Sequence, residues 1–123
     1  MFCGYFIAMS MDFTLEIAEH PPKLMIALKG DITSEARAQI RQAYARAHNG
    51  AFETVIFDFD EVRYINSEGV AVFFSLVRDM TGNLPKIVFS SLSPNLQGIV
   101  RVVGLTDYVR LADKDEVWPA EAE

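Results

Sequence analysis

The chain has 123 residues, of which half are hydrophobic and 23% are charged, and its formal net charge is −6. This length and composition fit one globular domain, which buries about two-thirds of the surface of its unfolded chain. The acidic balance argues against nucleic acid or an anionic membrane as the main partner, because both attract basic surfaces. Cys3 is the single cysteine, which excludes a disulfide framework and favours a reducing cytoplasm.

The first part of the chain predicts a short extension followed by a hairpin. Residues 1–11 are apolar but lack the basic start of a signal peptide, and no window approaches the roughly 20 apolar residues of a membrane span. We therefore expect residues 1–11 to be loosely ordered. Residues 13–19 alternate apolar and polar side chains, which is typical of a half-buried strand, and residues 24–30 predict a second strand. The HPPK turn at 20–23 is short, so the two strands should pair antiparallel.

Residues 31–50 predict the first helix, because both of its ends carry recognisable signals. Thr33 or Ser34 can cap the N-terminus, and Asn49-Gly50 can end the helix. Apolar side chains at helical spacing form one stripe that should face the core. The residues of this stripe are Ala36, Ile40, Ala43, Tyr44 and Ala47.

The remaining chain alternates between strands and helices. The expected elements are a strand at 53–59, a connection at 60–66, a helix at 67–82, a strand at 85–92, a helix at 93–105 capped by Ser93, and a short strand within 107–118. Residues 119–123 should form a frayed tail. This order predicts a single α/β domain at 12–118, in which an N-terminal hairpin is followed by alternating helices and strands on a mixed β-sheet.

The helix expected at 67–82 begins with a polar residue between two apolar stretches. Its apolar side chains form two rows, and the side with Ala71, Ser75, Arg78 and Asp79 should be solvated. Ser67 lies in the first turn, where backbone N–H groups lack partners and the helix dipole is positive. Ser67 can cap this helix, or it can carry a phosphate that the N–H groups stabilise. Asn66 can take the cap instead and leave Ser67 free.

The stretch VIFDFDEVRYINSEGVAVFFSLV resembles the core of the STAS domain, the anti-sigma factor antagonist family. LKGDITSEARAQI resembles the segment that opens the first helix of that family. KIVFSSLSPNLQGIVRVVGLTDYVRLADKDEV resembles its later strand, short helix and final strand. The resemblance covers roughly residues 12–118 and implies a STAS-like fold.

The resemblance implies a cytoplasmic regulatory binding domain that has no catalytic activity and no cofactor. In the family, a partner serine kinase that doubles as an anti-sigma factor binds the unmodified domain and phosphorylates its serine. Phosphorylation releases the partner, and a serine phosphatase restores binding. By position, Ser67 is the phosphoacceptor. The recognition surface is then expected to include Asp31, Thr33, Asn66, Glu68 and Gly69, with Val72 and Leu76 as apolar contacts.

Three positions depart from the family pattern. Asn66 replaces the usual Asp, Glu68 replaces a second Ser or Thr, and Thr33 replaces an acidic residue. A phosphate about 6 Å from Glu68 would be opposed by roughly 1–2 kcal/mol, which is close to the stabilisation that the helix end provides. Either Asn66 compensates by lowering the local negative charge, or phosphorylation is lost and Glu68 supplies a permanent partial mimic.

Two other functions remain open from the sequence. A STAS-like module can serve as a constitutive adaptor of a transporter or sensory assembly, which needs no phosphate. FDFDEV also resembles the first motif of haloacid-dehalogenase-type phosphatases, in which Asp58 and Asp60 would be the nucleophile and the acid/base with magnesium. Glu61-Val62 departs from that motif. We expect no metal site, and the sequence leaves the oligomeric state open.

Overall fold

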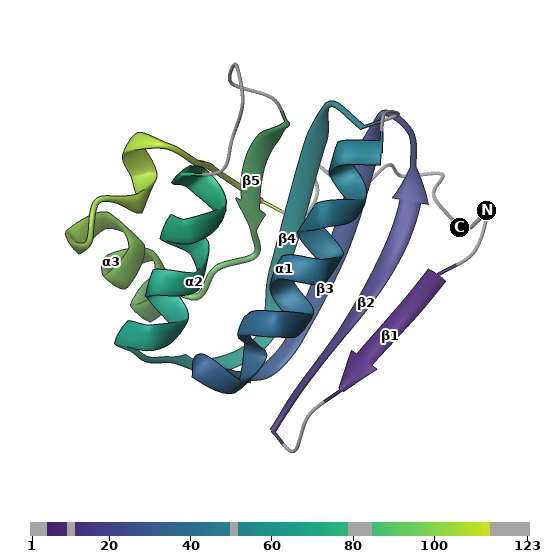
Figure 1. The fold of residues 1–123 in the computed structure, drawn as a ribbon. Helices are drawn as coiled ribbons and strands as arrows, with labels where there is room; N and C mark the ends of the chain where they lie inside the picture. Colours follow the sequence, from purple (N-terminus) through teal and green to yellow (C-terminus); the bar gives the residue numbers. More distant parts are fainter. Residues whose placement is uncertain (1–4, 10–11, 50–51, 79–84, 114–123) are drawn as a thin grey trace.

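One sheet with six strands organises the computed structural model, which describes residues 5–9, 12–49, 52–78 and 85–113 (Figure 1). The order of the strands in space follows their order in the chain. The strands are β1 (Tyr5–Met9), β2 (Phe13–His20), β3 (Lys23–Ile32), β4 (Thr54–Ile65), β5 (Lys86–Ser90) and β6 (Arg110–Ala112).

The pairing of the strands confirms the predicted mixed sheet and its N-terminal hairpin. β2 and β3 pair antiparallel, whereas β3, β4, β5 and β6 are mutually parallel. β1 adds a further antiparallel strand along β2, with Tyr5 opposite Ala18. The sequence did not predict this strand, which lies within the stretch that we expected to be loosely ordered. The predicted tail, residues 119–123, falls outside the described part of the chain.

The predicted helices are present, and several ends lie where the sequence placed them. The helical segments are η1 (Ser34–Ala36), α1 (Arg37–Ala45), η2 (Arg46–Asn49), α2 (Ser67–Arg78), α3 (Pro94–Val102) and η3 (Leu105–Asp107). Thr33 caps η1, because its side chain accepts a hydrogen bond from the Glu35 N–H at 3.3 Å. Gly104 follows α3 with a φ of +89°, a conformation that glycine adopts without strain. The expected helix ends at Gly50 and at residues 79–82 lie outside the described residues.

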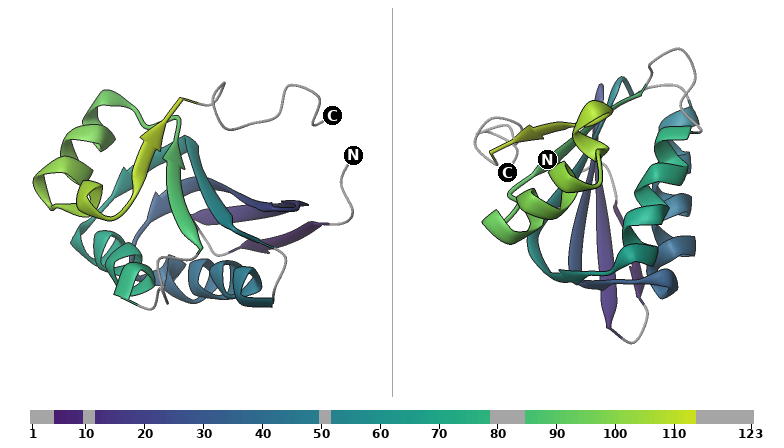
Figure 2. Two further views of the ribbon diagram at one scale, coloured as in Figure 1. Left: turned by 90° about the horizontal axis from the view of Figure 1, so that it is seen from above. Right: turned by 90° about the vertical axis from the view of Figure 1, so that its left-hand side faces the viewer.

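The main core lies on the face of the sheet that α1 and α2 cover side by side (Figures 1 and 2). Phe57, Phe59, Phe73 and Phe89 form an aromatic cluster there, with contacting ring centroids 4.8–5.9 Å apart. α3 lies at the β5–β6 side and contributes to the same core. The predicted apolar stripe of the first helix is buried as expected. Burial of this core stabilises the ends of β3 and β4, where the candidate site lies.

β4 continues well past the point where the sequence placed its end. We expected residues 60–66 to be a connection, but the strand extends to Ile65 and pairs with β3 throughout. The β3–β4 register shifts twice, and each shift adds one residue to β4. The core-facing residues are therefore Phe57, Phe59, Val62 and Ile65, with a spacing that changes from two to three. Such bulges turn additional side chains away from the core.

Candidate functional site

The start of α2 is capped by Asn66 and not by Ser67. The Gly69 N–H donates to Oδ1 of Asn66 at 2.8 Å, and the Asn66 N–H donates to the carbonyl of Ile32 at 3.2 Å. Ser67 is the first residue of the helix, and its side chain is exposed. Of the two arrangements that the sequence left open, the structure has the one in which the Ser67 hydroxyl is accessible.

Gly69 lets the first turn of α2 pack directly against the end of β3. A Cβ at this position would lie 2.2 Å from the Ile32 carbonyl oxygen and 2.9 Å from the Ile65 side chain. No residue with a side chain fits at that distance without moving the helix. The glycine therefore fixes Ser67 beside the segment that follows β3.

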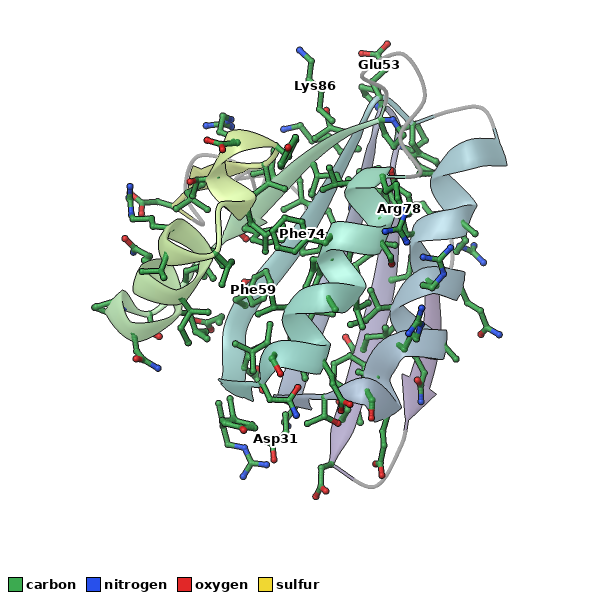
Figure 3. The ribbon with its side chains drawn as sticks, turned by 60° about the vertical axis from the view of Figure 1, so that its left-hand side comes forward. Asp31, Glu53, Phe59, Phe74, Arg78 and Lys86 are labelled. Atoms are coloured by element: carbon green, nitrogen blue, oxygen red, sulfur yellow. The ribbon has the colours of Figure 1, made fainter. Side chains whose placement is uncertain are left out.

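Asp31 lies near the end of β3, and Thr33 directly follows the strand. The Asp31 N–H donates to the Asp12 carbonyl at 2.9 Å, and the Asp31 carboxylate forms an ion pair with the Arg63 guanidinium at 3.2 Å. Figure 3 shows Asp31 at the end of the molecule where α2 begins, while Arg78 lies at the other end of that helix. The structure thus brings five of the predicted residues to one end of the sheet. They are Asp31, Thr33, Asn66, Glu68 and Gly69.

Val72 and Leu76 do not belong to this surface, contrary to the sequence-based expectation. Their exposed fractions are 2% and 1%, so both side chains are part of the core. The prediction that Ser75 lies on a solvated side of α2 is also wrong, because this residue is buried. Its Oγ donates to the Val72 carbonyl and accepts from the Arg41 guanidinium, each at 2.6 Å. α1 packs alongside α2, and its Arg41 contacts Ser75. The residue pattern of α2 alone does not show that a second helix covers this side.

Arg63 and Tyr64 are two site residues that the sequence analysis did not identify. Tyr64 lies opposite Asp31 in the β3–β4 ladder, and the second register shift lies between Gly30 and Asp31. Both Arg63 and Tyr64 are exposed although they are consecutive residues of a strand. The sequence offered one signal for their exposure. Val62 and Ile65 are three residues apart, whereas core-facing side chains in a regular strand are two residues apart.

Asp58 and Asp60, the residues of the phosphatase-like motif, lie within β4 on the opposite side from the aromatic core. Asp58 is buried, and its Oδ1 accepts the Asp60 N–H at 3.1 Å. Both carboxylates line a cavity of about 170 Å³ together with Glu16, Lys29 and Glu61. Among the described residues, no group of three or more His, Cys, Asp or Glu side chains is placed to hold a metal ion. Asp58 thus bonds the backbone of the bulged strand in which it lies.

A mixed sheet with this strand order and a capped helix start after β4 defines a STAS-type domain. The family model described as "Mlab, STAS domain" matches residues 15–112. The chain belongs to the STAS domain family. None of the helices in the described ranges is long and apolar enough to cross a membrane.

Solved structures of anti-sigma factor antagonists have the same fold. SpoIIAA in its unphosphorylated form is 21% identical with a TM-score of 0.65, and the match covers 92% of this chain and 91% of that chain. The phosphorylated form of the Bacillus SpoIIAA is also 21% identical, with a TM-score of 0.60 over 92% and 95% of the two chains. An anti-sigma factor antagonist from Mycobacterium paratuberculosis is 15% identical with a TM-score of 0.69 over 80% and 84%.

Proposed function

We propose that this STAS domain is a non-catalytic regulatory domain of the cytoplasm that binds a partner serine kinase and anti-sigma factor. Phosphorylation of Ser67 switches this binding off, and a serine phosphatase restores it. The observation that carries the proposal is the exposed Ser67 hydroxyl at the start of α2, where Asn66 already provides the cap. A kinase could therefore modify the hydroxyl without removing the hydrogen bond that caps the helix.

The electrostatics of the helix start support such a switch. A phosphate adds a charge of about −2 and three acceptor oxygens close to the first-turn N–H groups of α2. The same charge opposes docking of a partner whose surface is complementary to the unmodified site. Similar structures of SpoIIAA in its unphosphorylated and phosphorylated forms support the view that the fold accommodates phosphorylation.

Glu68 favours a second candidate function, the constitutive adaptor of a transporter or sensory assembly. This side chain is exposed and lies one residue after Ser67, so a negative charge is always present in the first turn of α2. A permanent charge at this position could replace the phosphate of a switch. Binding would then be independent of the state of Ser67.

Intact-mass measurement after incubation with ATP and lysate of the source cell tests the switch. We expect one added phosphate on the wild type and none on Ser67→Ala. Ser93→Ala is the matched control, because Ser93 also lies at a helix start but its Oγ accepts the Leu96 N–H. It should be phosphorylated like the wild type. An unmodified wild type, or equal phosphate on Ser67→Ala, would remove the switch.

A binding comparison then separates the two candidates. Ser67→Asp should release the partner that Ser67→Ala retains if the domain is a switch, and both variants should bind equally if it is a constitutive adaptor. Asp58→Asn should leave binding intact. Hydrolysis of a phosphate ester by the wild type with magnesium, and its loss in Asp58→Asn, would instead support the phosphatase function.

A further inference from the structure

The second bulge of β4 places two consecutive side chains at the surface just before α2. Val62 packs against the core and Ile65 is buried, whereas Arg63 and Tyr64 between them are both exposed. A regular strand would turn one of these two side chains towards the core. Bulges that redirect side chains are common next to functional sites.

Tyr64 is one of the few large hydrophobic side chains that the described surface exposes, with 53% of its surface accessible. Its Cα lies within about 11 Å of that of Ser67, because three residues span no more than this. A protein that binds in a standard interface covers about 800 Å² of its partner, which corresponds to a circle with a radius of about 16 Å. A kinase that takes Ser67 into its active site therefore covers the region of Tyr64.

The backbone and the neighbouring charge hold this part of β4 in place. Asp31, which lies opposite Tyr64 in the ladder, forms an ion pair with the Arg63 guanidinium. The Asn66 N–H that follows is bonded to the Ile32 carbonyl. The aromatic ring is thus presented by a paired strand and not by a free loop, which lowers the entropy that binding must remove.

The charges near the site indicate what the partner surface must contain. Arg63 neutralises Asp31, and Lys29 lies 3.5 Å from Glu61. Glu35 in η1 and Glu68 in α2 are exposed at the same end of the molecule, and neither forms an ion pair with another described residue. A complementary partner therefore carries cationic groups beside an apolar pocket.

We propose that Tyr64 is the anchor with which this domain docks onto the protein that phosphorylates Ser67. The partner accepts the phenol ring in an apolar pocket and presents cationic side chains to Glu35 and Glu68. This inference rests on the proposed phosphorylation of Ser67 and adds the contact that selects the kinase. Tyrosine is among the residue types that most often dominate binding at interfaces.

Tyr108 offers a matched control on the same chain. Its exposed fraction is 55%, almost equal to that of Tyr64. Tyr108 precedes β6, at the amino ends of the parallel strands, whereas Ser67 follows the carboxyl end of β4. The strand path between these two ends, from Ile56 to Ile65, is on the order of 30 Å. A kinase bound at Ser67 in a standard interface does not reach Tyr108.

The experiment measures the initial rate of Ser67 phosphorylation in lysate with ATP, by intact mass, over a series of domain concentrations. Tyr64→Ala should lower the rate at low concentration by about tenfold or more, as expected for an anchor residue. Tyr64→Phe, which keeps the ring, should stay within about twofold of the wild type, and Tyr108→Ala should be unchanged. A docking role raises the apparent KM, so a high concentration of Tyr64→Ala should restore the rate.

Each outcome decides the proposal. Equal rates for Tyr64→Ala and the wild type, or an equal loss in Tyr108→Ala, overturn the anchor while phosphorylation of Ser67 stands. A Tyr64→Ala variant with an unchanged KM and a lowered maximum rate also overturns docking as the role of this side chain. A wild type that takes no phosphate removes the proposed switch and the anchor together. Thermal unfolding of each variant confirms that the exposed substitutions leave the fold intact.

Discussion

α2 and α3 both begin next to a serine, but the two serines have different roles. Ser93 precedes α3, and its Oγ accepts the Leu96 N–H at 3.2 Å. In α2 the equivalent bond, at 2.8 Å, is accepted by Asn66, and Ser67 is the first helical residue. The comparison shows that the residue at the cap position decides what a nearby serine can do. A hydroxyl that the helix does not need is available for chemistry.

The largest expected effect comes from a glycine in each of these helices. Gly69→Ala places a Cβ 2.2 Å from the Ile32 carbonyl oxygen, so we expect a loss of roughly 3 kcal/mol or more in the free energy of unfolding. Gly98→Ala in α3 meets no atom within 4 Å and should stabilise the domain by about 0.5–1 kcal/mol. Denaturant unfolding measures both. Similar stabilities for the two variants would contradict the close packing at the start of α2.

An intermediate effect is expected for the two caps. Asn66→Ala and Ser93→Ala each remove the acceptor of a first-turn N–H and should each cost about 1 kcal/mol of stability. Ser67→Ala removes no hydrogen bond that the helix start depends on and should change stability by less than about 0.5 kcal/mol. Urea unfolding midpoints of the three variants distinguish these roles. A larger loss for Ser67→Ala than for Asn66→Ala would show that Ser67 is the cap.

The smallest effect concerns the ion pair beside the start of α2. The Arg63 and Asp31 side chains are 69% and 30% exposed, and solvent screens such a pair strongly. Arg63→Ala should therefore lower the free energy of unfolding by no more than about 0.5 kcal/mol, and the difference should shrink in high salt. Unfolding in low and high salt checks this. A loss that persists in high salt would mean that Arg63 contributes by packing.

Local sequence signals were sufficient for most of the fold. The α3 segment carries a capping serine, a proline and a closing glycine within the twelve residues from 93 to 104, and all three lie where they were predicted. The β2–β3 hairpin and the core stripe of the first helix follow equally from turn chemistry and periodicity. These elements were predictable because the residues that specify them are neighbours in the chain.

The candidate site was only partly predictable, because part of it depends on contacts between distant segments. Ser67 and Asn66 were recognisable from their place at a helix start. The burial of Val72 and Leu76 depends on α1 lying alongside α2, which no pattern within 67–82 reveals. The exposure of Tyr64 depends on how β4 pairs with β3, since the bulges appear only when the two registers are compared.

The contact between Gly69 and Ile32 has a consequence for how the domain would communicate. A helix whose first turn packs against a neighbouring carbonyl has no room to move inward, so the proposed phosphorylation of Ser67 should leave α2 in place. We therefore expect the unmodified and phosphorylated domains to share one backbone structure and to differ in the electric field around Ser67. A partner of such a domain would distinguish the two proposed states by surface potential alone, so the phosphate would be added and removed without any refolding of the domain.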